Sequence, residues 1–143
     1  IGEELNRGKL VVSNRYIASN MGHQGAKIAN RRARLKFFKW LYELEYKILG
    51  IPKPDCAIVL HMPAKIAQKL VVKKGRREYI KGRNKMDIHA RDIEHLKQAE
   101  ECYLEMTKTF PKDFKLVECV ENGRLLSIEE IHEKAWKEVQ KIL

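Results

Sequence analysis

Three short apolar runs, separated by segments of helical length, constrain the fold of this chain most strongly. They span residues 9–13, 56–60 and 115–120 and lack the polar–apolar alternation of a half-buried strand. Continuous apolar character predicts strands of a parallel sheet that is buried on both faces. The expected order is strand, helix, strand, helix, basic loop, helix, strand, helix. This alternation predicts an α/β fold of three layers, with helices on both faces of the sheet.

Four segments of the sequence have helical features. The longest contains neither proline nor glycine, and its apolar residues recur at helical spacing. The last begins with Ser127 and Glu130, which have the spacing of a capping box. The expected helices span residues 26–49, 63–72, 88–110 and 127–143.

The length of 143 residues is typical of one domain, so residues 1–143 are expected to form a single domain. The chain begins at Ile1 rather than at methionine, and residues 1–7 have the pattern of the last turns of a helix, ended by Gly8. A helix that starts at its own end suggests that an upstream segment is missing. We therefore expect an N-terminally truncated sequence, the C-terminal portion of a larger protein.

The charge balance is strongly basic, with 29 Lys and Arg residues against 19 Asp and Glu, a net charge of +10. Such an excess indicates an anionic partner: a phosphate ester, a nucleic acid or a membrane surface. No apolar run approaches the roughly 18 residues needed to span a bilayer, so no membrane is expected as a partner. The three cysteines are sparse, which favours a reduced, cytoplasmic protein over a disulfide scaffold.

A polar cluster follows the first apolar run. Arg15, just past the expected strand end, is well placed to bind a phosphate bidentately, since ligands of parallel sheets bind at the carboxyl ends of strands. Asn20 and Gln24 lie one helical turn apart, and each amide can both donate and accept at a base edge. A polar connection between strand and helix explains the same residues equally well, and spacing alone leaves both interpretations open.

A basic loop at about residues 73–86 is the second cluster. Seven of the thirteen residues from 73 to 85 are Lys or Arg, and two are glycine. Arginines in such a loop can close over a phosphoryl group and stabilise the charge that develops there. The alternative is a solvated charge run. Elsewhere the sequence has no P-loop motif, no Gly-x-Gly-x-x-Gly motif and no His or Cys pair with metal-ligand spacing.

Several motifs follow one another along the chain in a fixed order. They are Asn14-Arg15-Tyr16 with Ser19-Asn20, Gln24-Gly25-Ala26-Lys27, Gly50-Ile51-Pro52-Lys53-Pro54-Asp55, the basic loop, and Asp87-Ile88-His89 with Asp92. With them the sequence resembles, from about Gly8 to Leu143, the C-terminal two-thirds of thymidylate kinases, a family of P-loop nucleoside monophosphate kinases. The segment at residues 50–55, at its distance from the Arg-Tyr motif, is the most specific part of the resemblance.

The resemblance implies transfer of the γ-phosphoryl group of ATP to dTMP, giving dTDP, with Mg²⁺. It implies that Arg15 contacts the phosphate of dTMP and that Ser19 and Asn20 line the thymine pocket, Asn20 hydrogen-bonding the base. His23 takes the position beside the sugar, and Gln24 a neighbouring position in the base pocket. The basic loop corresponds to the family's lid, whose arginines supply catalytic charge. The catalytic residues expected on this basis are Arg15, Arg76, Arg77 and Arg83.

Three residues depart from the family's pattern, one of which is Ala90, where many relatives have Glu. Asn14 stands where the family has an acidic residue; its amide can hold a metal-bound water but lacks the charge that helps to hold Mg²⁺. His23 replaces the Tyr or Phe that disfavours a 2′-hydroxyl. The family's P-loop and first strand match no part of this sequence. The chain by itself is therefore expected to be inactive, with three of the family's five strands and no protein-built metal site.

The expectation is thus a dTMP kinase that binds dTMP and ATP and forms a homodimer through the helix at residues 26–49. A kinase for another nucleoside monophosphate remains open, since Asn14 and His23 allow it. A basic nucleic-acid-binding module without catalysis also remains open, because phosphate neutralisation needs only positive charge. Nucleic acid is the less favoured partner, since the basic residues gather in one loop and at one helix start without interleaved aromatic residues. A relative that has lost catalysis is the last alternative.

Overall fold

The computed structural model of the chain describes residues 1–73 and 93–143, so the expected lid falls almost wholly outside the described residues. The described helices are α1 (Gly2–Asn6), α2 (Ile17–Gly25), α3 (Arg31–Tyr42), the π-helical η1 (Glu43–Ile48), α4 (Ala64–Lys73), α6 (Ile93–Thr109) and α7 (Ile128–Val139). The described strands are β1 (Ala57–His61), β2 (Phe114–Glu118), β3 (Val120–Glu121) and β4 (Arg124–Leu125).

The second and third apolar runs form the parallel pair that the sequence predicts. β1 and β2 pair in register from Ala57 opposite Phe114 to His61 opposite Glu118. β3 and β4 add a short antiparallel hairpin, in which Asn122 and Gly123 have φ of 50° and 76°. Positive φ at both central residues is the type I′ hairpin turn, which Asn-Gly adopts at low cost.

The prediction of a strand at residues 9–13 is wrong. This run has no strand assignment, and its apolar side chains face solvent, with Leu10 69% and Val12 86% exposed. A strand exists only through hydrogen bonds to a neighbour, and within the described residues β1 pairs with β2 alone. The described parallel sheet therefore has two strands rather than three.

The helix expected at residues 26–49 starts later than predicted. α2 runs through Gly25, the chain leaves the helix, and a new helix begins after Asn30, whose Oδ1 accepts from the Ala33 N–H at 3.0 Å. Asparagine is a favoured N-cap, and the prediction overlooked this signal. At the other end the helix passes into η1. The capping box of Ser127 and Glu130 is confirmed at the start of α7.

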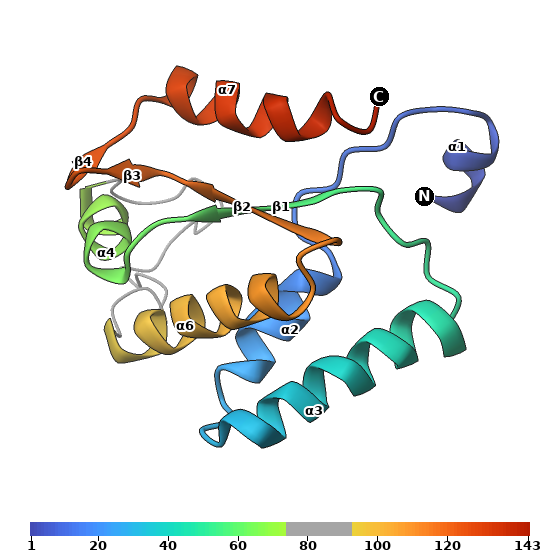
Figure 1. The fold of residues 1–143 in the computed structure, drawn as a ribbon, viewed down its shortest axis with the longest axis horizontal. Helices are drawn as coiled ribbons and strands as arrows, with labels where there is room; N and C mark the ends of the chain where they lie inside the picture. Colours follow the sequence, from blue (N-terminus) through green and yellow to red (C-terminus); the bar gives the residue numbers. More distant parts are fainter. Residues whose placement is uncertain (74–92) are drawn as a thin grey trace, which may run out of the picture.

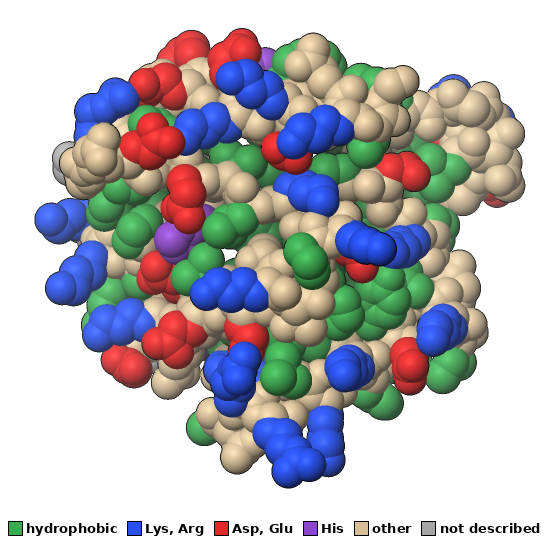
Figure 2. Space-filling view, in the orientation of Figure 1, with side chains coloured by type: hydrophobic (Ala, Val, Ile, Leu, Met, Phe, Trp, Pro, Cys, Tyr) green, Lys and Arg blue, Asp and Glu red, His purple; other side chains and the backbone are tan. Residues whose placement is uncertain are grey.

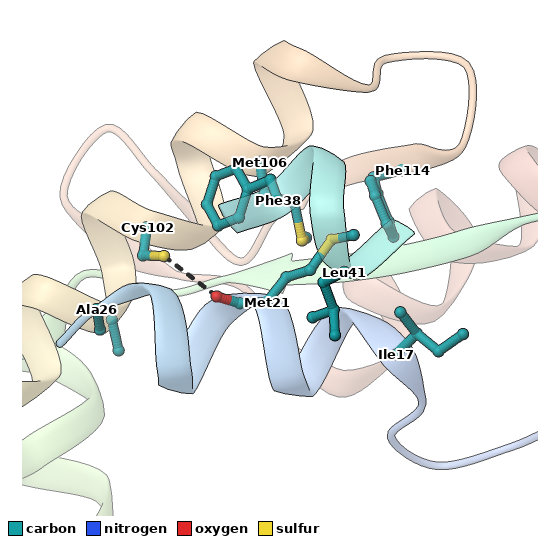
Figure 3. Close-up of a cluster of buried hydrophobic side chains, with 9 residues drawn as sticks. Ile17, Met21, Ala26, Phe38, Leu41, Cys102, Met106 and Phe114 are labelled. Carbon is teal, nitrogen blue, oxygen red and sulfur yellow. Dashed lines mark hydrogen bonds between the residues drawn. The ribbon is translucent and has the colours of Figure 1, made fainter. Parts of the chain in front are cut away.

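The core lies between α2, α3, α6 and β2. Figure 1 shows these three helices on one side of the β1–β2 pair and α7 on the other. Met21, Phe38, Cys102 and Met106 are fully buried, and Figure 3 shows them converging from the three helices. The Cys102 thiol donates to the Met21 carbonyl at 3.4 Å. This packing holds α2, which carries most of the predicted site residues, firmly against α6.

The surface mixes charges of both signs. Figure 2 shows Lys and Arg side chains spread over the visible face, with Asp and Glu among them and apolar patches between. Among the described residues, no helix is both long and apolar enough to cross a bilayer.

Candidate functional site

Arg15 has the most unusual backbone of the predicted site residues. Its φ is 71°, in the left-handed region that costs an L-residue roughly 1–2 kcal/mol. The Ser13 hydroxyl donates to the Arg15 carbonyl at 3.1 Å, and the Tyr16 hydroxyl donates to the Pro52 carbonyl at 3.0 Å. The second bond connects the Arg-Tyr motif to the segment at residues 50–55. Strain of this kind at a non-glycine residue is typical of functional sites.

The guanidinium group of Arg15 turns back onto α2. Its Nε donates to the Ser19 hydroxyl at 3.2 Å. Among the described residues, no acceptor is found for either Nη atom of Arg15. The fork of terminal amino groups on a guanidinium matches the oxygens of a phosphate.

Tyr103 of α6 completes this cluster. Its ring lies directly over Gly22, where an added Cβ would stand 2.3 Å from Cζ. Burial raises the pKa of the Tyr103 hydroxyl, while its hydrogen bond with Ser19 and the charge of Arg15 act in the opposite direction. The structure therefore brings Arg15, Ser19 and Tyr103 together, and Gly22 makes room for the ring.

Asn20 faces a buried carboxylate. Its Nδ2 donates to Oε1 of Glu45 at 3.1 Å. Asn20 is exposed, whereas Glu45, in η1, is only 8% exposed. Asn20 and Glu45 thus link α2 to the π-helical turn.

His23 and Gln24 have different surroundings. The His23 ring meets the Tyr103 ring edge-on at a centroid distance of 6.0 Å and stacks with His95 at 6.3 Å. Gln24 is exposed, and its Oε1 accepts from Lys27 Nζ at 3.0 Å. The structure thus joins His23 to the Arg15 cluster through Tyr103, whereas the side chain of Gln24 contacts Lys27 instead.

His61 joins the carboxyl ends of the two parallel strands to α6. Its Nδ1 lies 2.5 Å from Glu118 and its Nε2 3.0 Å from Glu100, whose other oxygen accepts from the Ala64 N–H at 2.8 Å. Burial lowers the pKa of His61, but the hydrogen bonds with Glu118 and Glu100 raise it by more. The net effect is a pKa above the ordinary value of 6.5. The two hydrogen-bonded contacts of the His61 ring connect β1, β2, α4 and α6.

Three predicted catalytic residues lie outside the described residues: Arg76, Arg77 and Arg83. Asn14, the candidate for holding a metal-bound water, is described and exposed. Across residues 1–73 and 93–143, no three His, Cys, Asp or Glu residues group closely enough to hold a metal ion. At the position where the family has an acidic residue, Asn14 offers a neutral amide.

Sequence reasoning missed two residues of the site. Glu45 had a signal, because it follows Phe38 and Leu41 at spacings of seven and four and thus lies on the buried face of the helix. A carboxylate on an apolar face needs a partner, so it is a candidate for a specific role. Tyr103 had no comparable signal, because only the packing of α6 on α2 brings it to Gly22.

Comparison with known proteins gives one family. The profile described as "Thymidylate kinase" matches residues 1–135. A "Thymidylate kinase" of Mycobacterium tuberculosis is 31% identical over 97 residues, which cover 68% of this chain and 44% of that protein. A "Probable thymidylate kinase" of Pyrobaculum aerophilum is 31% identical over 106 residues, 72% of this chain and 48% of that protein. The chain spans less than half the length of these relatives, and it belongs to the thymidylate kinase family.

Proposed function

We propose that this chain binds dTMP for phosphoryl transfer from ATP, which gives dTDP and ADP. The observation that carries the proposal is Arg15, held in a strained backbone conformation with its guanidinium anchored on Ser19 and both Nη atoms directed to no described acceptor. This backbone conformation is unfavourable by itself, and strain of this kind is retained where it serves a function, here the binding of an anion. Membership of the thymidylate kinase family names the anion as the phosphate of dTMP.

The base and the sugar are assigned to the same helix. In this proposal Asn20 hydrogen-bonds the thymine, with Ser19 and Gln24 lining the pocket. His23, which Tyr103 and His95 hold in place, lies beside the sugar. It stands where the family has the Tyr or Phe that disfavours a 2′-hydroxyl, so the choice between deoxyribose and ribose is made at this residue.

In this proposal, fixed positive charge promotes the phosphoryl transfer. A phosphate oxygen of dTMP attacks the γ-phosphorus of ATP, the bond to the bridging oxygen breaks and ADP leaves. Arg15 fixes the attacking phosphate in line, and the lid at about residues 73–86 brings Arg76, Arg77 or Arg83 to the transferring group. Guanidinium groups held in this way stabilise charge spread over the phosphoryl oxygens.

The ATP side of the reaction is also proposed from the family. The 143 residues contain no P-loop motif, so we assign the ATP cradle to residues outside this sequence and expect these residues alone to be inactive. In the family Mg²⁺ neutralises charge on ATP; among the described residues no three His, Cys, Asp or Glu side chains group closely enough to hold it by themselves.

Three wider assignments complete the proposal. Residues 1–143 form one domain of the three-layer P-loop kinase fold, supported by the parallel β1–β2 pair with helices on both sides. The protein acts as a homodimer through α3, supported by Trp40, 56% exposed beside Phe37. A cytoplasmic location fits the three free cysteines.

A kinase assay on the protein expressed from its complete gene tests the proposal. ADP release is measured with ATP fixed and with dTMP, dUMP, UMP, AMP and GMP offered in turn. Turnover with dTMP well above that with the other monophosphates is expected. Preference for another monophosphate would favour a kinase of different specificity, for which His23 is the reason. No turnover, together with salt-sensitive binding of random duplex DNA, would favour a nucleic-acid-binding module.

The role of Arg15 is tested by substitution with glycine, which accepts its backbone conformation. Arg15→Gly should lower turnover with dTMP by about a hundredfold or more, because a fixed charge is lost at the reacting phosphate. Thermal stability should not fall, since glycine relieves strain at φ of 71°. The matched control is Arg7→Ala, which removes an exposed arginine paired with Glu4 at 3.0 Å. Near-normal turnover of Arg15→Gly would refute the assignment.

A further inference from the structure

Glu45 is a buried carboxylate in an uncommon backbone. It is 8% exposed and lies in η1, where the Leu49 N–H bonds to the Leu44 carbonyl, five residues back, at 2.8 Å. π-helical turns are rare and frequently occur at functional sites. A buried carboxylate is unfavourable unless hydrogen bonds satisfy it, and among the described residues Asn20 is the side chain that does so.

The carboxylate determines which way the Asn20 amide faces. The two ends of an asparagine amide have nearly the same shape, so packing alone distinguishes them poorly. An ionised carboxylate only accepts hydrogen bonds, so the Nδ2 end must face Glu45, as it does at 3.1 Å. The reversed amide would set two acceptor oxygens against each other.

The other end of the amide is thereby defined as an acceptor. Oδ1 is the end of the Asn20 amide that points away from Glu45. Asn20 is exposed, and no group among the described residues donates a hydrogen bond to Oδ1. A base that meets this oxygen must present a donor. Thymine and uracil carry N–H at N3, whereas cytosine carries a lone pair at N3.

We propose that Glu45 is a positioning residue that selects a thymine-type base by holding the Asn20 amide with its oxygen toward N3–H of the base. This inference rests on the proposed function, in which Asn20 meets the base. Glu45 itself does not touch the nucleotide; it acts through Asn20. The preference for dTMP over dCMP thus originates in a residue of η1 rather than in α2.

Glutamine at position 45 separates the charge from the packing. It has nearly the size of glutamate, but its amide both donates and accepts, so it satisfies Asn20 in either orientation. In Glu45→Gln the Asn20 amide is free to turn its Nδ2 toward N3 of cytosine. The preference for dTMP over dCMP should fall by about tenfold, the effect of one net hydrogen bond.

The test measures dissociation constants for dTMP and dCMP by calorimetry, on the protein expressed from its complete gene. Glu43→Gln is the matched control, because Glu43 lies in the same turn but is exposed and pairs with Lys47 at 3.4 Å. The control should keep the wild-type ratio of the two constants. In an Asn20→Ala background, Glu45→Gln should leave the ratio unchanged, which a merely structural role of Glu45 does not predict.

Nuclear magnetic resonance gives a second measurement on the wild-type protein, which is informative even if Glu45→Gln does not fold. One side-chain amide proton of Asn20 should be shifted downfield by its bond to the carboxylate. Random-coil shifts for both protons would overturn the inference.

The outcomes separate the two proposals. An unchanged ratio in Glu45→Gln, with wild-type preference for dTMP intact, overturns the role of Glu45 and leaves the proposed function standing. Failure of the wild-type protein to bind either nucleotide overturns the proposed function, and the role of Glu45 with it.

Discussion

Gly22→Ala tests whether the packing of α6 on α2 builds the phosphate site. An added Cβ would lie 2.3, 2.4 and 2.7 Å from Cζ, Cε2 and Cε1 of Tyr103. Carbon atoms in ordinary contact are about 3.5–4.0 Å apart, so the ring must move by more than about 1 Å. Over-packing of this kind costs about 1–3 kcal/mol. Replacing a glycine inside a helix with alanine contributes about 1 kcal/mol in the other direction. We therefore expect Gly22→Ala to lower the free energy of unfolding by about 1 kcal/mol.

A double-mutant cycle measured by urea unfolding isolates the clash. In a Tyr103→Ala background the ring is gone, and Gly22→Ala should then raise the free energy of unfolding by about 1 kcal/mol, the helix propensity alone. The sign of the effect thus reverses between the two backgrounds. The displaced Tyr103 ring would also lose its hydrogen bond with Ser19. Affinity for dTMP should therefore fall in Gly22→Ala even though the protein stays folded. The same sign in both backgrounds would refute the reasoning.

Three further predictions follow from burial, charge and capping. Phe38→Ala should lower the free energy of unfolding by about 3–5 kcal/mol in urea, because Phe38 is fully buried; Val12→Ala, at a side chain 86% exposed, should cost less than about 1 kcal/mol. The folded-state pKa of His61 is raised above 6.5, so its stabilising effect is complete at lower pH and is lost as pH rises through the raised pKa. Urea midpoints followed from about pH 6 to about pH 9 should therefore depend less on pH in His61→Gln than in the wild-type protein. Ser127→Ala should lower the thermal midpoint through a loss of about 1 kcal/mol, since the Ser127 hydroxyl accepts from the Glu130 N–H at 3.2 Å.

The local pattern of the sequence determined several elements. The apolar runs around β1 and β2 predicted a parallel pair, because continuous apolar character suits strands covered by helices. The Ser127–Glu130 spacing predicted the start of α7, because a capping box depends on residues only three apart. The motif around Arg15 predicted the family, which the match over residues 1–135 confirmed.

Features that depend on distant partners could not be predicted from the sequence. The run at residues 9–13 has the apolar pattern of a strand but meets no strand among the described residues, and pairing requires a neighbour that pattern alone cannot supply. Equally, nothing near Asn20 in sequence indicates which end of its amide is exposed. Glu45, twenty-five residues later, decides this by facing Nδ2 across the contact.

Composition, periodicity and motif order thus determined the class of fold, most of the helices and the family. Tertiary structure decided the left-handed backbone of Arg15, the position of Tyr103 over Gly22 and the orientation of the Asn20 amide. The physical reason is the range of the interactions. Capping and apolar periodicity act within a few residues, whereas the site is assembled by α6 and η1, which reach α2 only when the core around Met21 and Phe38 has formed.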